Sequence, residues 1–257
     1  MPIAPPSVRI AAVAGLPLVA EGDDLGRILG DAIAAGHVLC DGDVLVVAQK
    51  VVSKAEGRIV RLAGVTPSAE AASISTVSGK DPRVITLISD ESAEFMRVRP
   101  GVIIVRNRHG HVLANAGIDA SNVAPGEDEA VLLWPRDPDA SARALRLALE
   151  GRFGVRIAVI VSDSLGRAWR MGTMGTAIGA SGLRPLRDRR GEADLFGREL
   201  QATLTGLADE LAAAASLVMG EGAEGLPAAI VSGAVFERDE EAGIAALLRP
   251  LDEDLFR

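Results

Sequence analysis

Short apolar runs typical of buried strands alternate with amphipathic helical stretches along most of this chain, and this alternation limits the fold more than any other feature. The clearest predicted buried strand is VRIAVIVSDSLGR (155–167), whose apolar run ends at Val161. It follows a stretch (137–154) with the acidic start and glycine end of a helix. The alternation fails at 98–123, where a hairpin turning at 108–110 is predicted. The pattern favours an α/β or α+β fold with a mixed sheet.

Other segments extend this pattern in both directions. The sequence predicts further helices over residues 21–36, 81–92, 206–220 and 240–250. It predicts strands within residues 7–19, 41–60, 130–135 and 226–233, and a polar segment after the strand near residue 48. With 257 residues the chain is long enough for one large domain or two lobes, and we expect residues 1–257 to form a single domain of this kind.

The composition indicates a compact protein that binds small molecules. The chain is 48% hydrophobic and 24% charged, as in ordinary globular proteins. Its net charge of −8 disfavours binding to nucleic acid or anionic membranes, and its 3% aromatic content disfavours a stacking platform for single strands. The single cysteine, Cys40, is expected to be packed and excludes an internal disulfide. No apolar run is long enough for a membrane span and no signal pattern begins the chain, so we expect a cytoplasmic protein.

Polar side chains follow two apolar runs at the point where each run ends. Asp163 and Ser164 come directly after Val161, and Asp119 and Asn122 follow the run LANAG. Ligands of open α/β sheets bind beyond the carboxyl ends of strands, so these side chains are candidates for a site. The alternatives are structural: Asp163 or Ser164 could cap a helix, and Asp119 could form an Asx turn.

A third acidic loop and two lysines extend this candidate site. Glu221 and Glu224 lie in a glycine-rich turn, although Gly220 could be an ordinary helix cap and Glu221 a solvated turn residue. Hard divalent cations bind several oxygen ligands, and three acidic loops could supply them. Lys50 and Lys54 follow a predicted strand and suit a phosphate group, unless both are simply solvated.

Several familiar motifs are missing from the sequence. It contains no G-x-x-x-x-G-K-[ST] loop, no G-x-G-x-x-G after a strand and no G-x-S-x-G elbow. His37, His109 and His111 are not spaced as a metal cluster, and the latter two are expected to be exposed turn residues. P-loop, Rossmann and serine-hydrolase functions therefore lose their main support.

Six segments together resemble one known family. QKVVSKAEGR, NAGIDASNV, SDSLGRAWR, AIGASGL, GEADLFGREL and LVMGEGAEGLP follow one another as in the F420 γ-glutamyl ligases, over residues 15 to 249. The resemblance implies a GTP-dependent ligase that attaches L-glutamate to the phospholactyl carboxylate of F420-0 and then a second glutamate in γ-linkage. It implies Mg²⁺ or Mn²⁺, K⁺ as an activator, and an intertwined homodimer with an α+β fold of its own. We expect no C-terminal flavin domain.

The resemblance also assigns roles to individual residues. Asp119, Asp163 and Ser164 match the family's metal ligands, with Ser164 in place of the usual Thr, and Glu221 stands where the family usually has Gln. Lys54 and Asp163 are the expected catalytic residues. The residues that match its GTP contacts are Gly15, Leu16, Pro17, Leu18, Gln49, Lys50, Lys54, Asn122, Met219, Gly220, Glu221, Gly222, Ala223, Glu224, Gly225 and Leu226.

One segment departs from the family pattern. After GRAWR the family usually reads G-Q-T-D-x-A-[IV]-G, whereas this chain has GTMGTAIG (172–179). An amide and a carboxylate are lost. We expect the segment to face a substrate, so this loss should change the recognition of a charged group. Two other functions stay open: a paralogous amide-forming ligase acting on another carboxylate, and a GTP- or metal-binding regulatory protein without turnover.

Overall fold

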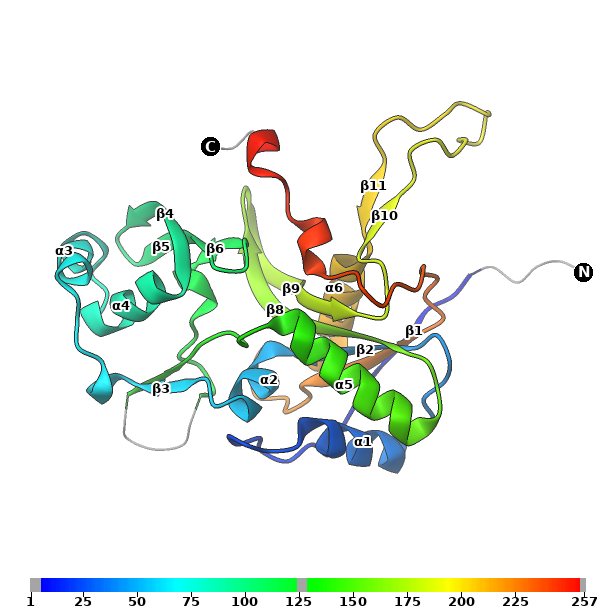
Figure 1. Cartoon of the computed structure of the whole chain (residues 1–257), viewed down its shortest axis with the longest axis horizontal. Helices are drawn as coiled ribbons and strands as arrows, with labels where there is room; N and C mark the ends of the chain where they lie inside the picture. Colours follow the sequence, from blue (N-terminus) through cyan, green and yellow to red (C-terminus); the bar gives the residue numbers. More distant parts are fainter. Residues whose placement is uncertain (1–5, 124–128, 255–257) are drawn as a thin grey trace, which may run out of the picture.

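The computed structural model describes residues 6–123 and 129–254, and its centre is a mixed five-stranded sheet (Figure 1). Only β2 and β8 pair in parallel, and the other neighbours are antiparallel. The α+β class with mixed sheets is therefore confirmed. In spatial order the strands are β1 (Arg9–Ala12), β12 (Ala228–Ser232), β2 (Val44–Ala48), β8 (Ala158–Arg167) and β9 (Arg170–Ser181).

Both faces of this sheet are buried, which explains the continuous apolar runs of its central strands. Leu45 and Val159 face a core shared with α1 (Leu25–Gly36) and α5 (Pro138–Phe153). Val46 and Ile160 face the opposite core, where α6 (Leu207–Met219) packs. Figure 1 shows α1 and α5 on one side of the strands and α6 on the other. Side chains that alternate along a strand thus supply two separate cores.

A second group of elements has a core of its own, to the left in Figure 1. The predicted hairpin is confirmed there, and Asn107 and His111 close its turn through a backbone hydrogen bond. The pair β3 (Ile59–Arg61) and β7 (Ala130–Leu132) connects this group to the main sheet. Its other elements are α3 (Ala69–Ser78), α4 (Pro82–Asp90), β4 (Ser92–Arg99), β5 (Val102–Asn107) and β6 (Val112–Ala114).

Some sequence predictions were wrong. The strand predicted over 155–167 is confirmed as β8, but the strand end expected at Val161 is wrong, because β9 supplies antiparallel hydrogen-bond partners along the polar half up to Arg167. The predicted polar segment after β2 is the short helix α2 (Gln49–Ala55). The predicted closing helix over 240–250 is only a 3₁₀ turn, Ile244–Leu247. Cys40, which was expected to be packed, is exposed.

Strand β9 is an edge of the sheet, and two helices protect it. Asp139 of α5 accepts a hydrogen bond from the Ala180 N–H at 2.8 Å, and Asp209 of α6 accepts one from the Ala177 N–H at 2.9 Å. Burial raises the pKa of both carboxyl groups. Backbone N–H groups that could otherwise pair with a strand of another molecule are thus hydrogen-bonded within the chain.

A narrow arm leaves the body between Leu186 and Gly206. It begins and ends with β10 (Leu186–Asp188) and β11 (Leu204–Gly206), and Figure 1 shows it projecting away from the sheet. Leu195 and Phe196 in this arm are 98% and 94% exposed. Across residues 6–123 and 129–254, no helix combines the length and apolar character that crossing a membrane requires.

The buried ion cluster around Arg146 gives a stability prediction. Its side chain is 4% exposed and pairs with Glu150 at 2.9 Å and Glu240 at 2.5 Å. Arg146→Ala removes the buried cation and leaves these carboxylates only the longer contacts with Arg238 and Arg156, so we expect it to lower the unfolding free energy by about 3 kcal/mol in urea titrations. Arg143→Ala, on the same helix but in the exposed pair with Glu241, should cost less than about 1 kcal/mol. Equal losses would contradict this account.

Candidate functional site

The segments that carry the candidate residues meet at one edge of the five-stranded sheet. The Val13 N–H donates to the Ala228 carbonyl at 2.8 Å, and the Ala48 N–H donates to the Pro227 carbonyl at 2.8 Å. The parallel pairing of β2 with β8 ends at Ala48 and Ser162, so β8 extends beyond β2. The loop after β1, the start of α2, the loop before β12 and the polar half of β8 therefore leave the sheet on the same side.

Lys50 and Asp119 form the central ion pair of this edge. The Lys50 Nζ lies 2.7 Å from the Asp119 Oδ2 and donates to the Ser121 Oγ at 2.7 Å. The Asp119 backbone is held by hydrogen bonds in both directions with Leu132. Its Oδ1 accepts from the Ser121 N–H at 2.7 Å, so the Asx-turn alternative is correct for one oxygen while the other meets the lysine. Burial raises the pKa of Asp119, but hydrogen bonds from Lys50 and Ser121 outweigh it and lower the pKa overall.

Lys54 reaches the same turn one helical turn later. Its Nζ donates to the Asn122 carbonyl at 2.6 Å, and the Asn122 Nδ2 donates to the Gly222 carbonyl at 3.3 Å. Asn122 has a φ of +55°, a left-handed conformation that Asn tolerates better than most residues. Burial, followed by repulsion from Lys50, lowers the pKa of Lys54. The lysines are therefore not independent solvated side chains, and they bring positive charge to the turn that carries Asp119.

Asp163 lies within β8, opposite Thr176 of β9, and does not cap a helix. Its Oδ2 accepts from the Trp134 Nε1 at 2.8 Å, and its Oδ1 accepts from the Ser164 N–H at 2.8 Å. Burial raises the pKa of Asp163, the indole hydrogen bond opposes that rise, and the charge of Asp119 adds to it. The two aspartates are thus close enough to repel each other, which favours a cation between them.

The third acidic loop is tied to β8 through Ser164. The Ser164 Oγ donates to the Glu221 Oε1 at 2.7 Å. Gly220 caps α6, as the structural alternative predicted, and Glu224 accepts from the Gly222 N–H at 2.7 Å inside the loop. Glu221 therefore turns toward the site, whereas Glu224 organises its own loop.

The donor set of this edge fits a hard cation. Asp119, Asp163, Ser164 and Glu221 offer only oxygen atoms, and the ammonium group of Lys50 already lies against one carboxylate. Within the part of the chain that the structure describes, no three His, Cys, Asp or Glu side chains cluster as a complete metal cage. Mg²⁺ commonly takes one or two carboxylates from the protein and the rest of its ligands from water and phosphate, and this edge suits that arrangement.

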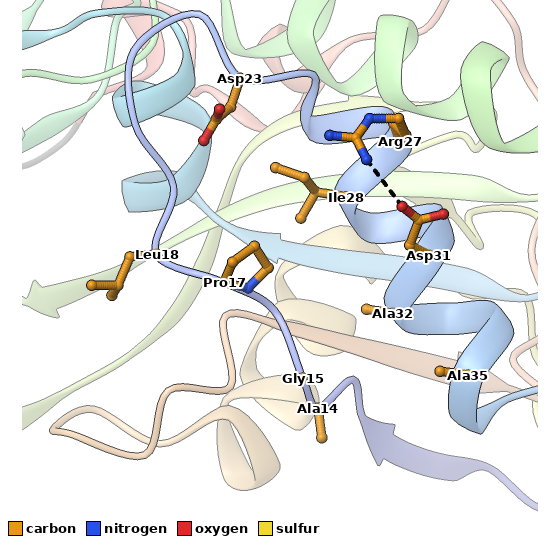
Figure 2. Close-up of a pocket in the computed structure, with 10 residues that line it drawn as sticks. All are labelled: Ala14, Gly15, Pro17, Leu18, Asp23, Arg27, Ile28, Asp31, Ala32 and Ala35. Carbon is orange, nitrogen blue, oxygen red and sulfur yellow. Dashed lines mark hydrogen bonds and ion pairs between the residues drawn. The ribbon is translucent and has the colours of Figure 1, made fainter.

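A pocket of about 500 Å³ lies between the segment after β1 and helix α1 (Figure 2). Gly15, Pro17 and Leu18 line one side, whereas Leu16 packs against the core. Arg27 and Asp31 form an ion pair of 3.2 Å on the other side. The same loop also contacts α2, where the Gly22 N–H donates to the Ala55 carbonyl. The loop therefore links the pocket to the helix that carries both lysines.

Sequence reasoning gave the Ser121 hydroxyl no role, missed Trp134 and misjudged His111. Ser121 bridges Lys50 and Asp119, and Trp134 holds Asp163, yet Trp134 sits in an apolar run that gives no polar signal. His111 was expected to be exposed but is buried edge-on against Trp134, with ring centroids 5.2 Å apart. The hairpin turn folds back over the body, which explains this burial.

The departing segment 172–179 belongs to β9. Thr176 and Gly175 pair with Asp163 and Ser164, so the segment borders the site. A Cβ on Gly175 would lie 2.4 Å from the Ala212 carbonyl oxygen of α6. Part of the segment is therefore a packing contact with α6, Ile178 is fully buried in the core on the other face of the sheet, and Met174 is half-buried.

Comparisons with known proteins point to one family. A family model described as F420-0:Gamma-glutamyl ligase matches residues 15–233. The chain is 46% identical over 252 residues to a coenzyme F420:L-glutamate ligase of Methanothermobacter thermautotrophicus, covering 97% of this chain and 99% of that protein. It is 45% identical over 255 residues to the one of Methanopyrus kandleri, covering 98% of each. A third such ligase, from Archaeoglobus fulgidus, is 42% identical over 250 residues, or 97% of this chain and 96% of that protein.

The buried His111 predicts a pH dependence of stability. Burial, and then His109, lower its pKa from 6.5 to about 4, and its Nδ1 has no hydrogen-bond partner in the described part of the chain. Between these values the unfolded chain binds a proton that the folded chain does not, so the unfolding free energy falls as pH falls. This loss should total about 3 kcal/mol in urea titrations. It should be absent in His111→Leu and retained in His109→Leu. Equal pH slopes in wild type and His111→Leu would contradict this assignment.

Proposed function

Because this chain belongs to the F420-0:gamma-glutamyl ligase family, we propose that it joins L-glutamate to F420-0 in a GTP-dependent reaction and adds a second glutamate in γ-linkage. Its relatives are named for ligation of L-glutamate to coenzyme F420. The contact of Lys50 and Lys54 with the 119–122 turn carries the GTP part of the proposal. In a chain of net charge −8, two of the three lysines meet at one turn beside Asp163, as a phosphate site requires.

The proposed chemistry is activation of a carboxylate. The γ-phosphoryl group of GTP passes to a carboxylate oxygen of F420-0, and GDP leaves. The amine of glutamate then attacks the carbonyl carbon of this acyl phosphate, the C–N bond forms, and phosphate leaves with the carboxylate oxygen. Lys50 and Lys54 stabilise negative charge on the phosphoryl oxygens, with Lys54 as the catalytic cation. No protein nucleophile is needed for either step.

The nucleotide and the metal occupy adjoining parts of the edge in this proposal. Asn122, Gln49, and the segments 15–18 and 219–226 bind GTP. Asp119, Asp163, Ser164 and Glu221 hold Mg²⁺ or Mn²⁺, and K⁺ acts as a further activator. When bound, a divalent cation neutralises charge on the transferring phosphoryl group. Asp163 would be one of the residues that hold this cation and is therefore assigned as catalytic together with Lys54.

We also propose that the protein acts as a homodimer. The arm that contains β10 and β11 projects from the body and exposes Leu195 and Phe196. Large apolar side chains on a projecting arm suit burial against a second copy of the chain. Residues 1–257 then form one ligase-like domain whose two lobes, the main sheet and the β4–β6 group, flank the site.

A related ligase activity on another carboxylate is the second candidate. It is favoured by the loss of a family carboxylate in the 172–179 segment, which borders Asp163 through β9. In this case GTP would bind as proposed while F420-0 or glutamate would be used poorly.

Mass spectrometry of the product tests the proposed function directly. Incubation with F420-0, L-glutamate, GTP and Mg²⁺ or Mn²⁺ should add one and then two glutamyl units, and omission of any component should stop the reaction. Asp119→Asn and Asp163→Asn should each lower turnover at limiting metal by ~10–100-fold or more, since each removes a charged ligand. Asp90→Asn, an exposed carboxylate of α4, is the control. Full turnover in both site variants, or GTP use without ligation, would reject the proposal.

Lys54 gives a separate test of the phosphate site. Lys54→Met should raise the KM for GTP or lower kcat by about 10- to 100-fold, the usual loss for a charged hydrogen bond. More glutamate should not restore the rate. Lys80→Met removes the remaining lysine, which lies between α3 and α4, and should leave GTP kinetics unchanged. An unaltered GTP titration in Lys54→Met would show that this lysine does not contact the nucleotide.

A further inference from the structure

Trp134 connects the apolar core to the charged edge of the sheet. Its side chain is 2% exposed, and its Nε1 donates to the Asp163 Oδ2 at 2.8 Å. A buried indole N–H requires an acceptor, and here the acceptor is a carboxylate of the proposed metal set rather than a backbone carbonyl. The residue is therefore more than a packed aromatic ring, because its single polar atom meets the site.

Three neighbours hold the indole in this position. The Arg58 Nε donates to the Trp134 carbonyl at 2.8 Å, and the His111 ring meets the indole edge-on at 80°. Gly117 has a φ of +78°, and a Cβ there would lie 2.4 Å from the Trp134 Nε1. Glycine thus permits the close approach of the NAGID turn to the ring nitrogen. These contacts come from separate elements: Arg58 holds the main chain, and the indole N–H cannot turn away from Asp163 without disturbing the ring contacts with His111 and Gly117.

The second oxygen of Asp163 is fixed as well. Its Oδ1 accepts from the Ser164 N–H at 2.8 Å. Each carboxylate oxygen can accept more than one hydrogen bond or ligand, so both keep capacity for a cation. A carboxylate held at both oxygens loses little rotational freedom when it binds a cation, which favours binding.

We propose that Trp134 is a positioning residue: its indole N–H orients the Asp163 carboxylate for the divalent cation, and the indole reports the presence of that cation. The inference rests on the proposed function in one respect, the assignment of Asp163 to the metal. Loss of an outer partner of a metal ligand commonly reduces metal affinity by ~10–100-fold. A ring that served only to fill the core would have no such effect if its volume were kept.

Direct Mn²⁺ binding tests the positioning role without reference to turnover. Free Mn²⁺ is followed by electron paramagnetic resonance as it is titrated with wild type, Trp134→Phe and Trp169→Phe. Trp134→Phe keeps an aromatic ring but lacks the N–H, so its Kd for Mn²⁺ should rise about 10-fold. Trp169→Phe, which changes an 89% exposed ring, should bind as wild type does. In an Asp163→Asn background, Trp134→Phe should cause no further loss, because the positioned carboxylate is already gone.

The fluorescence of Trp134 gives a second measurement that does not alter this residue. The chain has two tryptophans, so Trp169→Phe leaves Trp134 as the single emitter. Mn²⁺ should quench this emission with the midpoint seen by resonance, and Asp163→Asn should abolish the quenching. Mn²⁺ binding without quenching, or an unchanged Kd in Trp134→Phe, overturns the inference alone. If wild type binds no Mn²⁺ with or without GTP, both the inference and the metal ligands assigned in the proposed function are wrong. If wild type binds Mn²⁺ but does not ligate glutamate, only the proposed function is contradicted.

Discussion

The ion pair between Lys50 and Asp119 is the contact on which the site depends. It joins the first turn of α2, directly after the central strand β2, to the turn that follows the second group of strands. Asp119 is bonded in turn to Leu132 of β7, whose partner β3 follows α2 in the chain. The ion pair between Lys50 and Asp119 therefore lies where the main sheet and the β4–β6 group meet. A change that separated this pair would affect the geometry of both.

The negative and the positive charges of this edge are each only partly neutralised by the residues around them. The carboxylates of Asp119 and Asp163 repel each other, and the ammonium groups of Lys50 and Lys54 beside them also repel each other. In the described residues Lys50 neutralises Asp119, which lowers the pKa of that carboxyl group. A cation at the carboxylates would release the lysine for an anionic group, so cation and phosphate binding should support each other. This exchange of partners is the physical basis of the proposal that one edge binds a metal–nucleotide complex.

Much of the fold and of the site was predictable from the sequence, because both follow from local patterns. Val44–Val47 and Ala158–Val161 are buried on both faces, and such strands read as continuous apolar runs. Asp119, Asn122 and Asp163 stood out because each is a polar residue that follows an apolar run. The polar half of β8 gives no apolar signal of its own, since it is a strand only through pairing with β9. The role of Trp134 was also hidden, because its acceptor lies 29 positions further along the chain and an indole in an apolar run resembles any core residue. The family resemblance is confirmed, while the individual site roles remain proposals.

The central claim is that this edge moves a phosphoryl group from GTP to the acceptor carboxylate before the amide forms. Labelling the acceptor carboxylate of F420-0 with ¹⁸O and analysing the released phosphate by mass spectrometry tests that claim most directly. The account predicts one ¹⁸O atom in the phosphate for each amide bond formed on the labelled F420-0 carboxylate, because the carboxylate oxygen leaves with the phosphoryl group. Amide formation with unlabelled phosphate would contradict the account, since the carboxylate would not then have been phosphorylated.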